Sequence, residues 1–218
     1  MIEINDLTFE YPGSDFRFNL NSLNIKSGET VALIGPSGYG KTTLLNLLSG
    51  ILEPIKGTIH LNGTEVTKLA DSQRRNFRIT NIGFVFQNFE LIEYLNVLDN
   101  IILSYRINPS LSMNREVIDR AETISEQLGL GDKLKRNVGK LSQGEMQRVA
   151  ICRAILNNPK IILADEPTGN LDPQNKEKIM EILFDYSSRE NATLITVTHD
   201  HSLLKGFDEV LDMQQLVN

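Results

Sequence analysis

Apolar and polar positions alternate along the first part of the chain. Residues 2–11 and 16–25 follow a period of two, which predicts two half-buried strands joined by a turn at residues 12–15. We expect the first strand to be interrupted by a turn at Asn5 and Asp6, because both residues favour turns. Alternation of this kind is typical of an antiparallel sheet with one face on a core.

Short runs that are almost wholly apolar follow, and they predict strands buried on both faces, as in a parallel sheet. These runs are residues 31–34, 82–87, 160–166 and 193–198. Residues 58–62 predict a further short strand that ends at an Asn-Gly turn, and residues 208–213 could add a last strand. The order of the runs indicates an antiparallel sheet lying beside a parallel one.

Helical patterns separate the apolar runs. The predicted helices are residues 40–52, 71–78, 97–106, 114–129, 141–156 and 173–189. The first is apolar over most of its circumference, which indicates burial against a sheet, and we expect Pro54 and Gly57 to close it. We predict one domain over residues 1–218, in which a helical subdomain at 89–158 is inserted into an α/β core of residues 1–88 and 159–218.

Composition and charge exclude several classes of protein. Hydrophobic residues make up 40% and charged residues 23%, which is typical of a soluble globular chain. No apolar run reaches the roughly 18 residues of a membrane span, and the first residues do not resemble a secretory signal. A net charge of −6 argues against a nucleic-acid partner bound by charge alone. The single cysteine, Cys152, fits a reducing cytoplasm, and any membrane attachment is expected to come through a protein partner.

The first candidate for chemistry is the segment at residues 35–42, Gly-Pro-Ser-Gly-Tyr-Gly-Lys-Thr, which matches the phosphate-binding P-loop at every required position. Glycines allow backbone N–H groups to surround an anion, and the helix that follows adds its positive end. Lys41 is expected to reach the terminal phosphates and the Thr42 hydroxyl to contact Mg²⁺. A glycine-rich turn that binds nothing is the alternative, which the flanking strand and helix patterns disfavour.

Polar side chains stand where the predicted buried strands end, the usual place for ligand contacts in an α/β sheet. Asp165 can hold Mg²⁺, and Glu166 can orient or deprotonate a water molecule. Gln87 and His199 end two other strands, and His199 is interpreted as facing the phosphate site. A metal site that uses His201 as well has no third histidine or cysteine nearby in the sequence to support it.

Two further helix starts carry recognisable patterns. Ser142 and Glu145 have the spacing of a capping box, and Gly144 between them suggests backbone N–H groups left open for an anion. Asp172 before Pro173 predicts an N-cap followed by proline in the first turn. Tyr11 ends the first predicted strand, where it could cover a hydrophobic edge or stack on a flat base.

Taken in order, these motifs resemble the ATP-binding cassette family, the ATPase subunits of ABC transporters, over essentially the whole chain. Residues 35–42 resemble its Walker A motif, residues 141–145 its signature, and residues 161–165 its Walker B motif. Gln87 and His199 match the Q-loop and switch histidine, Glu166 matches the catalytic glutamate, and Asn170, Leu171 and Asp172 match the D-loop. The resemblance implies a P-loop NTPase (RecA-like) core with an N-terminal antiparallel β subdomain and an inserted α-helical subdomain.

The resemblance also implies a site that binds ATP and Mg²⁺. Catalytic roles are implied for Glu166, His199, Gln87 and Lys41, and metal contacts for Thr42, Gln87 and Asp165. Nucleotide contacts are implied for Tyr11, Gly35, Pro36, Ser37, Gly38, Tyr39, Gly40, Lys41, Thr42, Thr43, Ser142, Gly144 and Asp172. In this family two cassettes face head to tail, so that Ser142 and Gly144 are expected to serve the ATP bound by a second copy.

The chain departs from the family pattern at a few positions. Gln143 stands where glycine is usual, Glu145 where glutamine is usual, and Tyr39 where a small residue is usual. Residues 84–95 and 164–172 resemble the branch that contains lipoprotein-release, macrolide-export and cell-division type cassettes. Members of that branch act with separate membrane subunits, so we expect a permease partner to dock near residues 89–98 and to hold the chain on the inner face of the cell membrane.

Other readings stay open from the sequence alone. A DNA-repair or translation-factor ATPase of the same family usually carries a long coiled-coil insertion or two cassettes, and neither is present here. A small-molecule kinase or a GTPase would lack the signature at residues 141–145. A nucleotide-binding regulator without turnover is disfavoured by Glu166 and His199.

Overall fold

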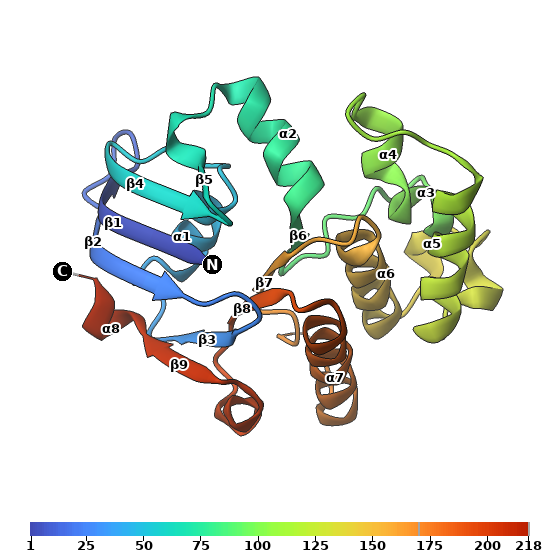
Figure 1. Cartoon of the computed structure of the whole chain (residues 1–218). Coiled ribbons are helices and arrows are strands. Elements are labelled where there is room, and N and C mark those ends of the chain that lie inside the picture. The colour runs from blue at the N-terminus through green and yellow to red at the C-terminus, as the bar shows by residue number, and fades with distance from the viewer. Residues whose placement is uncertain (170, 218) are drawn as a thin grey trace.

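The computed structural model describes residues 1–169 and 171–217 and contains two β-sheets (Figure 1). The four-stranded sheet is antiparallel and has the order β2-β1-β4-β5. Its strands are β1 Ile2–Glu10, β2 Arg17–Ile25, β4 Lys56–Leu61 and β5 Thr64–Glu65. Asn62 and Gly63 form the turn between β4 and β5 with positive φ angles of 48° and 82°, as the Asn-Gly pair predicts.

The five-stranded sheet is parallel and has the order β6-β7-β8-β3-β9. Its strands are β3 Thr30–Ile34, β6 Ile82–Val85, β7 Ile161–Asp165, β8 Thr193–Val197 and β9 Glu209–Asp212. Every predicted apolar run contributes a strand to this sheet, which confirms the α/β core and the antiparallel sheet beside it.

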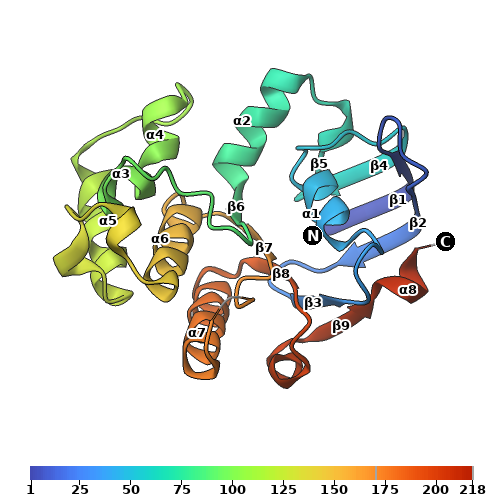
Figure 2. The same ribbon diagram turned by 180° about the vertical axis from the view of Figure 1, so that it is seen from behind.

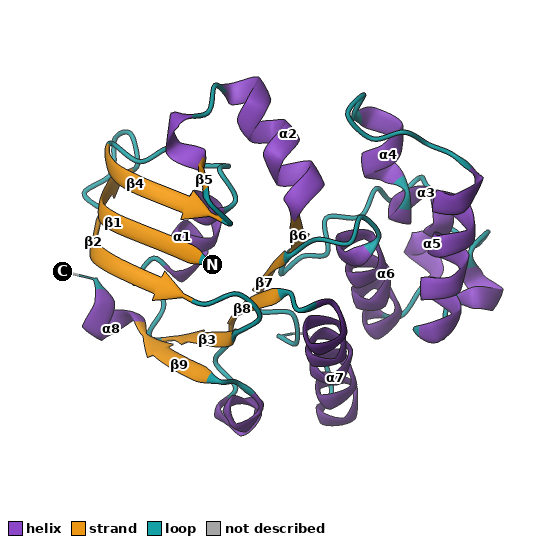
Figure 3. Cartoon of the chain, viewed as in Figure 1, coloured by secondary structure: helices purple, strands orange, loops and turns teal. Residues whose placement is uncertain are grey.

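Helices cover both faces of the parallel sheet (Figures 1 and 3). They are α1 Lys41–Leu48, α2 Asp71–Asn81, α3 Val97–Ile101, α4 Leu103–Ile107, α5 Arg115–Gln127, α6 Gln143–Ile155, α7 Pro173–Glu190 and α8 Met213–Leu216. Short 3-10 turns lie at Val66–Lys68, Gly131–Lys133, Val138–Lys140 and His201–Gly206. Among the described residues, no helix is long and apolar enough to cross a membrane.

The parallel sheet separates two hydrophobic cores, because successive side chains of a strand point to opposite faces. Ile161 and Leu163 of β7 face the core that holds α1 and the antiparallel sheet. Ile162 and Ala164 face the core shared by α3, α5, α6 and α7. Figure 2 shows α1 against the antiparallel sheet, with α5 and α6 at the opposite end of the molecule. The helices between β6 and β7 therefore share their core with the sheet.

Several predicted boundaries were wrong, for local reasons. The chain at Asn5 and Asp6 stays within β1, where Asp6 has a φ of 50° and the pairing with β4 shifts register, so the expected turn is a β-bulge. The first helix ends at Leu48 because Gly50 takes a φ of 66°, well before Pro54. The helix expected at residues 97–106 is two helices, since Ile102 has a ψ of 6°.

Candidate functional site

The loop between β3 and α1 curls around the N-terminus of the helix. Gly35, Gly38 and Gly40 have φ angles of 134°, 88° and 82°, a region that side chains disfavour. Gly40 is the N-cap of α1, and a Cβ there would lie 2.6 Å from the Phe18 ring. The loop thus requires glycine at this point, and its conformation opens the first N–H groups of α1 toward an anion.

Lys41 is the first residue of α1 and is only 6% exposed. Its Nζ donates hydrogen bonds to the carbonyls of Gly35, at 2.7 Å, and Pro36, at 2.8 Å. Burial lowers the pKa of this ammonium, while the neighbouring carboxyls of Glu166 and Asp165 oppose that shift. The side chain is therefore held across the glycine loop with a partly desolvated charge.

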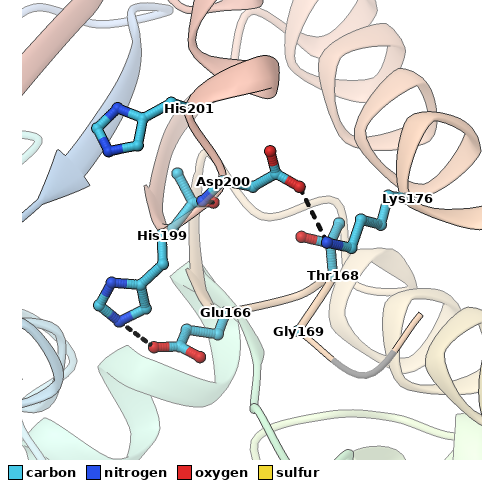
Figure 4. A pocket seen from close by; sticks show the side chains of 8 residues that line it. Glu166, Thr168, Gly169, Lys176, His199, Asp200 and His201 are labelled. Carbon is cyan, nitrogen blue, oxygen red and sulfur yellow. Dashed lines mark hydrogen bonds and ion pairs between the residues drawn. The ribbon is translucent and has the colours of Figure 1, made fainter. Parts of the chain in front are cut away.

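The predicted strand-end side chains meet beside this loop. Glu166 Oε1 lies 2.7 Å from His199 Nε2, and Glu166 Oε2 accepts a hydrogen bond from Gln87 Nε2 at 3.0 Å (Figure 4 shows the glutamate and histidine). β6, β7 and β8 are neighbours in the sheet, so their carboxyl ends bring the three residues together. The arrangement gives one carboxylate an amide partner and an imidazole partner.

Asp165 ends β7 and is 6% exposed. One of its oxygens, Oδ1, is buried and has no hydrogen-bond partner among the described residues. Burial raises the pKa of this carboxyl, and a hydrogen bond with the Thr42 side chain opposes the rise. An unsatisfied buried carboxylate oxygen beside a hydroxyl is the donor set that Mg²⁺ prefers, so the residues fit a magnesium ion.

A cavity of about 400 Å³ extends from the glycine loop to the end of the first strand. It is lined by Tyr11, Phe16, Ser37, Gly38, Gly40, Lys41, Thr42, Thr43, Glu166 and His199. The Tyr11 hydroxyl lies 3.2 Å from Thr43 Oγ1, and its ring packs at 4.8 Å against Phe9 and at 5.7 Å against Phe16. Tyr11 is 36% exposed, so part of its ring remains open to a ligand.

Phe16 is the cavity residue that the sequence did not single out. The alternating pattern places Phe16 at the start of the second predicted strand, whereas in the structure it lies just before β2, which begins at Arg17. The sequence signal for Phe16 is that it and Tyr11 are aromatic residues on either side of the turn at residues 12–15. Tyr39, for which the family resemblance implies a nucleotide contact, is not among the residues that line this cavity and is 41% exposed.

A second cavity of about 320 Å³ adjoins the first and shares Glu166 and His199 with it (Figure 4). On its far side Lys176 of α7 donates to Asp200 at 2.9 Å. Hydrogen bonds from Ser202 and Lys176 lower the pKa of Asp200 to about 2. His201 lines this cavity, but the described residues form no cluster of three side chains suited to a metal ion there.

The signature residues and Asp172 lie away from the glycine loop and its cavity. Ser142 is the N-cap of α6, Asp172 is the N-cap of α7, and neither they nor Gly144 line the two cavities beside Glu166. α1 and α6 lie on opposite faces of the parallel sheet (Figures 1 and 2). Asn170, which the sequence places in the D-loop, is outside the described residues. The chain thus holds two separate sets of candidate anion-binding groups.

A glycine loop that opens a buried helix, beside two adjacent carboxylates at the end of β7, defines a P-loop nucleoside triphosphatase. A family model described as ABC transporter matches residues 18–169. The chain belongs to the ABC transporter family, and it is one of the ATP-hydrolysing cassettes of that family.

Within this family, the chain is similar to two characterised types of ATP-binding protein. It is 41% identical over 191 residues to the lipoprotein-releasing system ATP-binding protein LolD of Bacteroides thetaiotaomicron, covering 88% of this chain and 87% of that protein. It is 43% identical over 193 residues to the macrolide export ATP-binding/permease protein MacB of Rhodopirellula baltica, covering 88% of this chain and spanning 28% of that protein's length.

Solved structures agree. The ATP-binding cassette MJ0796, in a dimeric post-hydrolysis state bound to ADP and Pi, superposes with a TM-score of 0.87 at 34% identity. The match covers 97% of this chain and 94% of that chain. This structural likeness confirms the predicted fold. The LolD and MacB relatives confirm the resemblance to lipoprotein-release and macrolide-export cassettes.

Proposed function

We propose that two copies of this cassette bind ATP between them, head to tail, and use its hydrolysis to move a separate membrane subunit. The observation that carries the proposal is the separation of Ser142 and Gly144 from the P-loop and Glu166 within one chain. A second chain can bring its own Ser142 to the P-loop, whereas one chain cannot fold that way without breaking its core. The dimeric state of the related cassette MJ0796 supports this arrangement.

Each residue of the P-loop side then has a defined task. Gly35, Pro36, Ser37, Gly38, Tyr39, Gly40 and Thr43 shape the loop, whose N–H groups and Lys41 bind the phosphates. Tyr11 offers its partly exposed ring to the adenine base. Glu166 accepts a proton from water, or orients it, while His199 and Gln87 fix the carboxylate through the bonds described above.

Magnesium would be held by Asp165, Thr42 and Gln87. When bound, Mg²⁺ neutralises charge on the phosphates. The unsatisfied Oδ1 of Asp165 supports this assignment, because a buried carboxylate oxygen without a partner is otherwise costly.

The second copy supplies the groups that close the site. Ser142 and Gly144 begin α6, and Asp172 begins α7. The two helix starts are adjacent, since a Cβ on Gly144 would lie 3.6 Å from Asn175 in the first turn of α7. The N-termini of α6 and α7 therefore form one surface that can contact the nucleotide bound by the partner chain.

The membrane subunit would dock near residues 89–98, and the chain would lie on the cytoplasmic face of the cell membrane through that contact. Leu91 and Leu98 pack into the core, but Tyr94 is 83% exposed. Beside this stretch, Phe84 and Phe86 stack at 4.2 Å and line a further cavity with Ile79 of α2. An aromatic tip next to an apolar hollow suits a short amphipathic helix of the partner. Export, extraction or mechanical transmission is the expected task.

Glu166→Gln tests the catalytic assignment. The amide keeps the size of the side chain but cannot accept the proton, so we expect ATP hydrolysis to fall by about 100-fold or more and an ATP-bound dimer to accumulate. Phosphate release and sedimentation with and without ATP measure both effects. Hydrolysis at the parent rate would remove Glu166 from the mechanism, and a variant that stays monomeric with ATP would contradict the shared site.

A further inference from the structure

The start of α6 is held by a reciprocal pair of hydrogen bonds. Ser142 Oγ accepts from the backbone N–H of Glu145 at 3.3 Å, and Glu145 Oε2 accepts from the backbone N–H of Ser142 at 2.7 Å. This capping box fixes the serine and leaves the N–H groups of Gln143 and Gly144 as the first-turn donors without an intrahelical acceptor. The Ser142 side chain also forms a hydrogen bond with the Glu145 carboxylate, so the serine and the glutamate are held together at this helix start.

The same capping box places a negative charge at this helix start. Hydrogen bonds from Ser142 and Lys133 lower the pKa of the Glu145 carboxyl to about 2, so it is ionised at neutral pH. A phosphate bound by Ser142 would therefore lie close to the Glu145 carboxylate, which is hydrogen-bonded to the backbone N–H of the same serine. Like charges in a partly desolvated site repel strongly, and the helix dipole alone does not offset a full charge.

Lys133 lies on the other side of this carboxylate. Its Nζ is 3.0 Å from Glu145 Oε1, and the two side chains are 22% and 17% exposed. Lys133 belongs to the short turn Gly131–Lys133 that follows α5, so its ammonium reaches α6 from a different element. Its other carboxylate neighbour, Asp132, is 3.8 Å away and 80% exposed, where water screens it.

We propose that Lys133 is a positioning residue of the shared ATP site, which neutralises Glu145 so that the start of α6 can accept the γ-phosphate bound by a second copy. The proposal rests on the head-to-tail function proposed above. It explains how a signature with glutamate in place of the usual glutamine remains compatible with an anion. The ammonium holds one carboxylate oxygen, the Ser142 N–H holds the other, and the net charge that faces the phosphate is close to zero.

The test uses the full chain carrying Glu166→Gln, in which ATP-driven dimers accumulate. Adding Lys133→Met should raise the ATP concentration for half-maximal dimer formation, measured by sedimentation, by about five- to tenfold, the scale of one partly screened charge. Lys133→Arg should keep the parent value, and Lys133→Met with Glu145→Gln should restore it, because the repelling charge is then gone. Lys135→Met, which removes an exposed lysine two residues away, is the matched control and should change nothing.

Two further readouts separate this role from a structural one. Calorimetric affinity for Mg-ADP should be equal in all variants, since one chain's own P-loop lies away from Lys133. Thermal unfolding of the variants should coincide within a few degrees, and Lys133→Gln replaces Lys133→Met if the latter unfolds. An unchanged half-maximal ATP concentration, or a double variant that stays impaired, overturns the role of Lys133 while the shared site stands. A parent Glu166→Gln chain that does not dimerise with ATP overturns the shared site and this proposal with it.

Discussion

At the scale of single residues, the backbone of Glu166 directs its side chain. Its φ of 44° lies in the left-handed region, which costs a non-glycine residue about 1 kcal/mol or more. The conformation is held by the Glu166 N–H, which donates to Val197 O at 3.1 Å, and by its carbonyl, which accepts from Gly169 N at 3.0 Å. In this conformation the carboxylate lies within hydrogen-bond distance of Gln87 and His199.

Lys41 gives the first residue-scale prediction. Lys41→Ala removes the ammonium that lines the glycine-loop cavity, so we expect Mg-ATP affinity to fall by about 10- to 100-fold, the value of a charge-assisted contact. Equilibrium binding of a fluorescent ATP analogue measures the change. Lys178→Ala, an exposed lysine on α7, is the control. Equal binding by Lys41→Ala and the parent would contradict the phosphate role.

Tyr11 gives the second residue-scale prediction. Tyr11→Ala should weaken nucleotide binding by roughly five- to tenfold, since a stacked aromatic contributes about 1 kcal/mol. Tyr11→Phe should retain most of the affinity, because it loses only the 3.2 Å contact with Thr43. If the tyrosine merely covers a hydrophobic edge, thermal stability will fall in the alanine variant while its affinity for ATP stays at the parent value.

At the scale of elements, α6 joins the two functional ends of the helical region. Its N-cap Ser142 belongs to the proposed shared site, and Arg153 near its C-terminus donates to the carbonyls of Phe89, at 2.6 Å, and Glu90, at 2.5 Å. Phe89 and Glu90 both have positive φ angles, of 62° and 50°. The arginine therefore stabilises a strained segment at the start of the proposed docking stretch.

Arg153→Met should release this segment. Because two charge-assisted hydrogen bonds are lost, we expect the free energy of unfolding, measured by urea denaturation, to decrease by about 1–3 kcal/mol. We also expect faster amide hydrogen exchange at residues 87–92. Arg153→Lys should recover only part of the loss, since an ammonium lacks the planar fork. Arg136→Met, at an exposed arginine, serves as control. Parent-like exchange in this segment would show that Arg153 does not hold it.

At the scale of the whole molecule, both cores depend on the parallel sheet between them. Cys152 lies in the core shared by the helices and the sheet and is 0% exposed. Burial raises the pKa of its thiol to about 12, so it stays protonated through the neutral range. The cysteine therefore reports on opening of this core.

The thiol should be unreactive in the native protein. We expect a disulfide reagent at pH 8 to label Cys152 at least about 1,000-fold more slowly than in urea-unfolded chain, because labelling requires the core to open. Absorbance of the thiolate that leaves when Cys152 forms a mixed disulfide with the reagent measures the rate. Rapid labelling of the native chain would mean that the helical layer opens separately from the sheet.

The sequence by itself determined the local features of this protein. Alternation over residues 2–11 and the apolar run at 31–34 specify strands, because side-chain period and burial are local properties of the chain. The glycine loop, the acids after β7 and the capping box at Ser142 were readable for the same reason, since each depends on residues within one turn or one strand end.

Tertiary structure decided what sequence spacing does not encode. The contact of Gln87, Glu166 and His199 depends on the strand order β6-β7-β8, and Phe16 reaches the cavity only through the fold of the antiparallel sheet. The bulge at Asp6 and the stop at Gly50 arise where pairing and packing override propensity. Lys133 meets Glu145 across two elements, so only the packed helices place an ammonium beside the signature carboxylate.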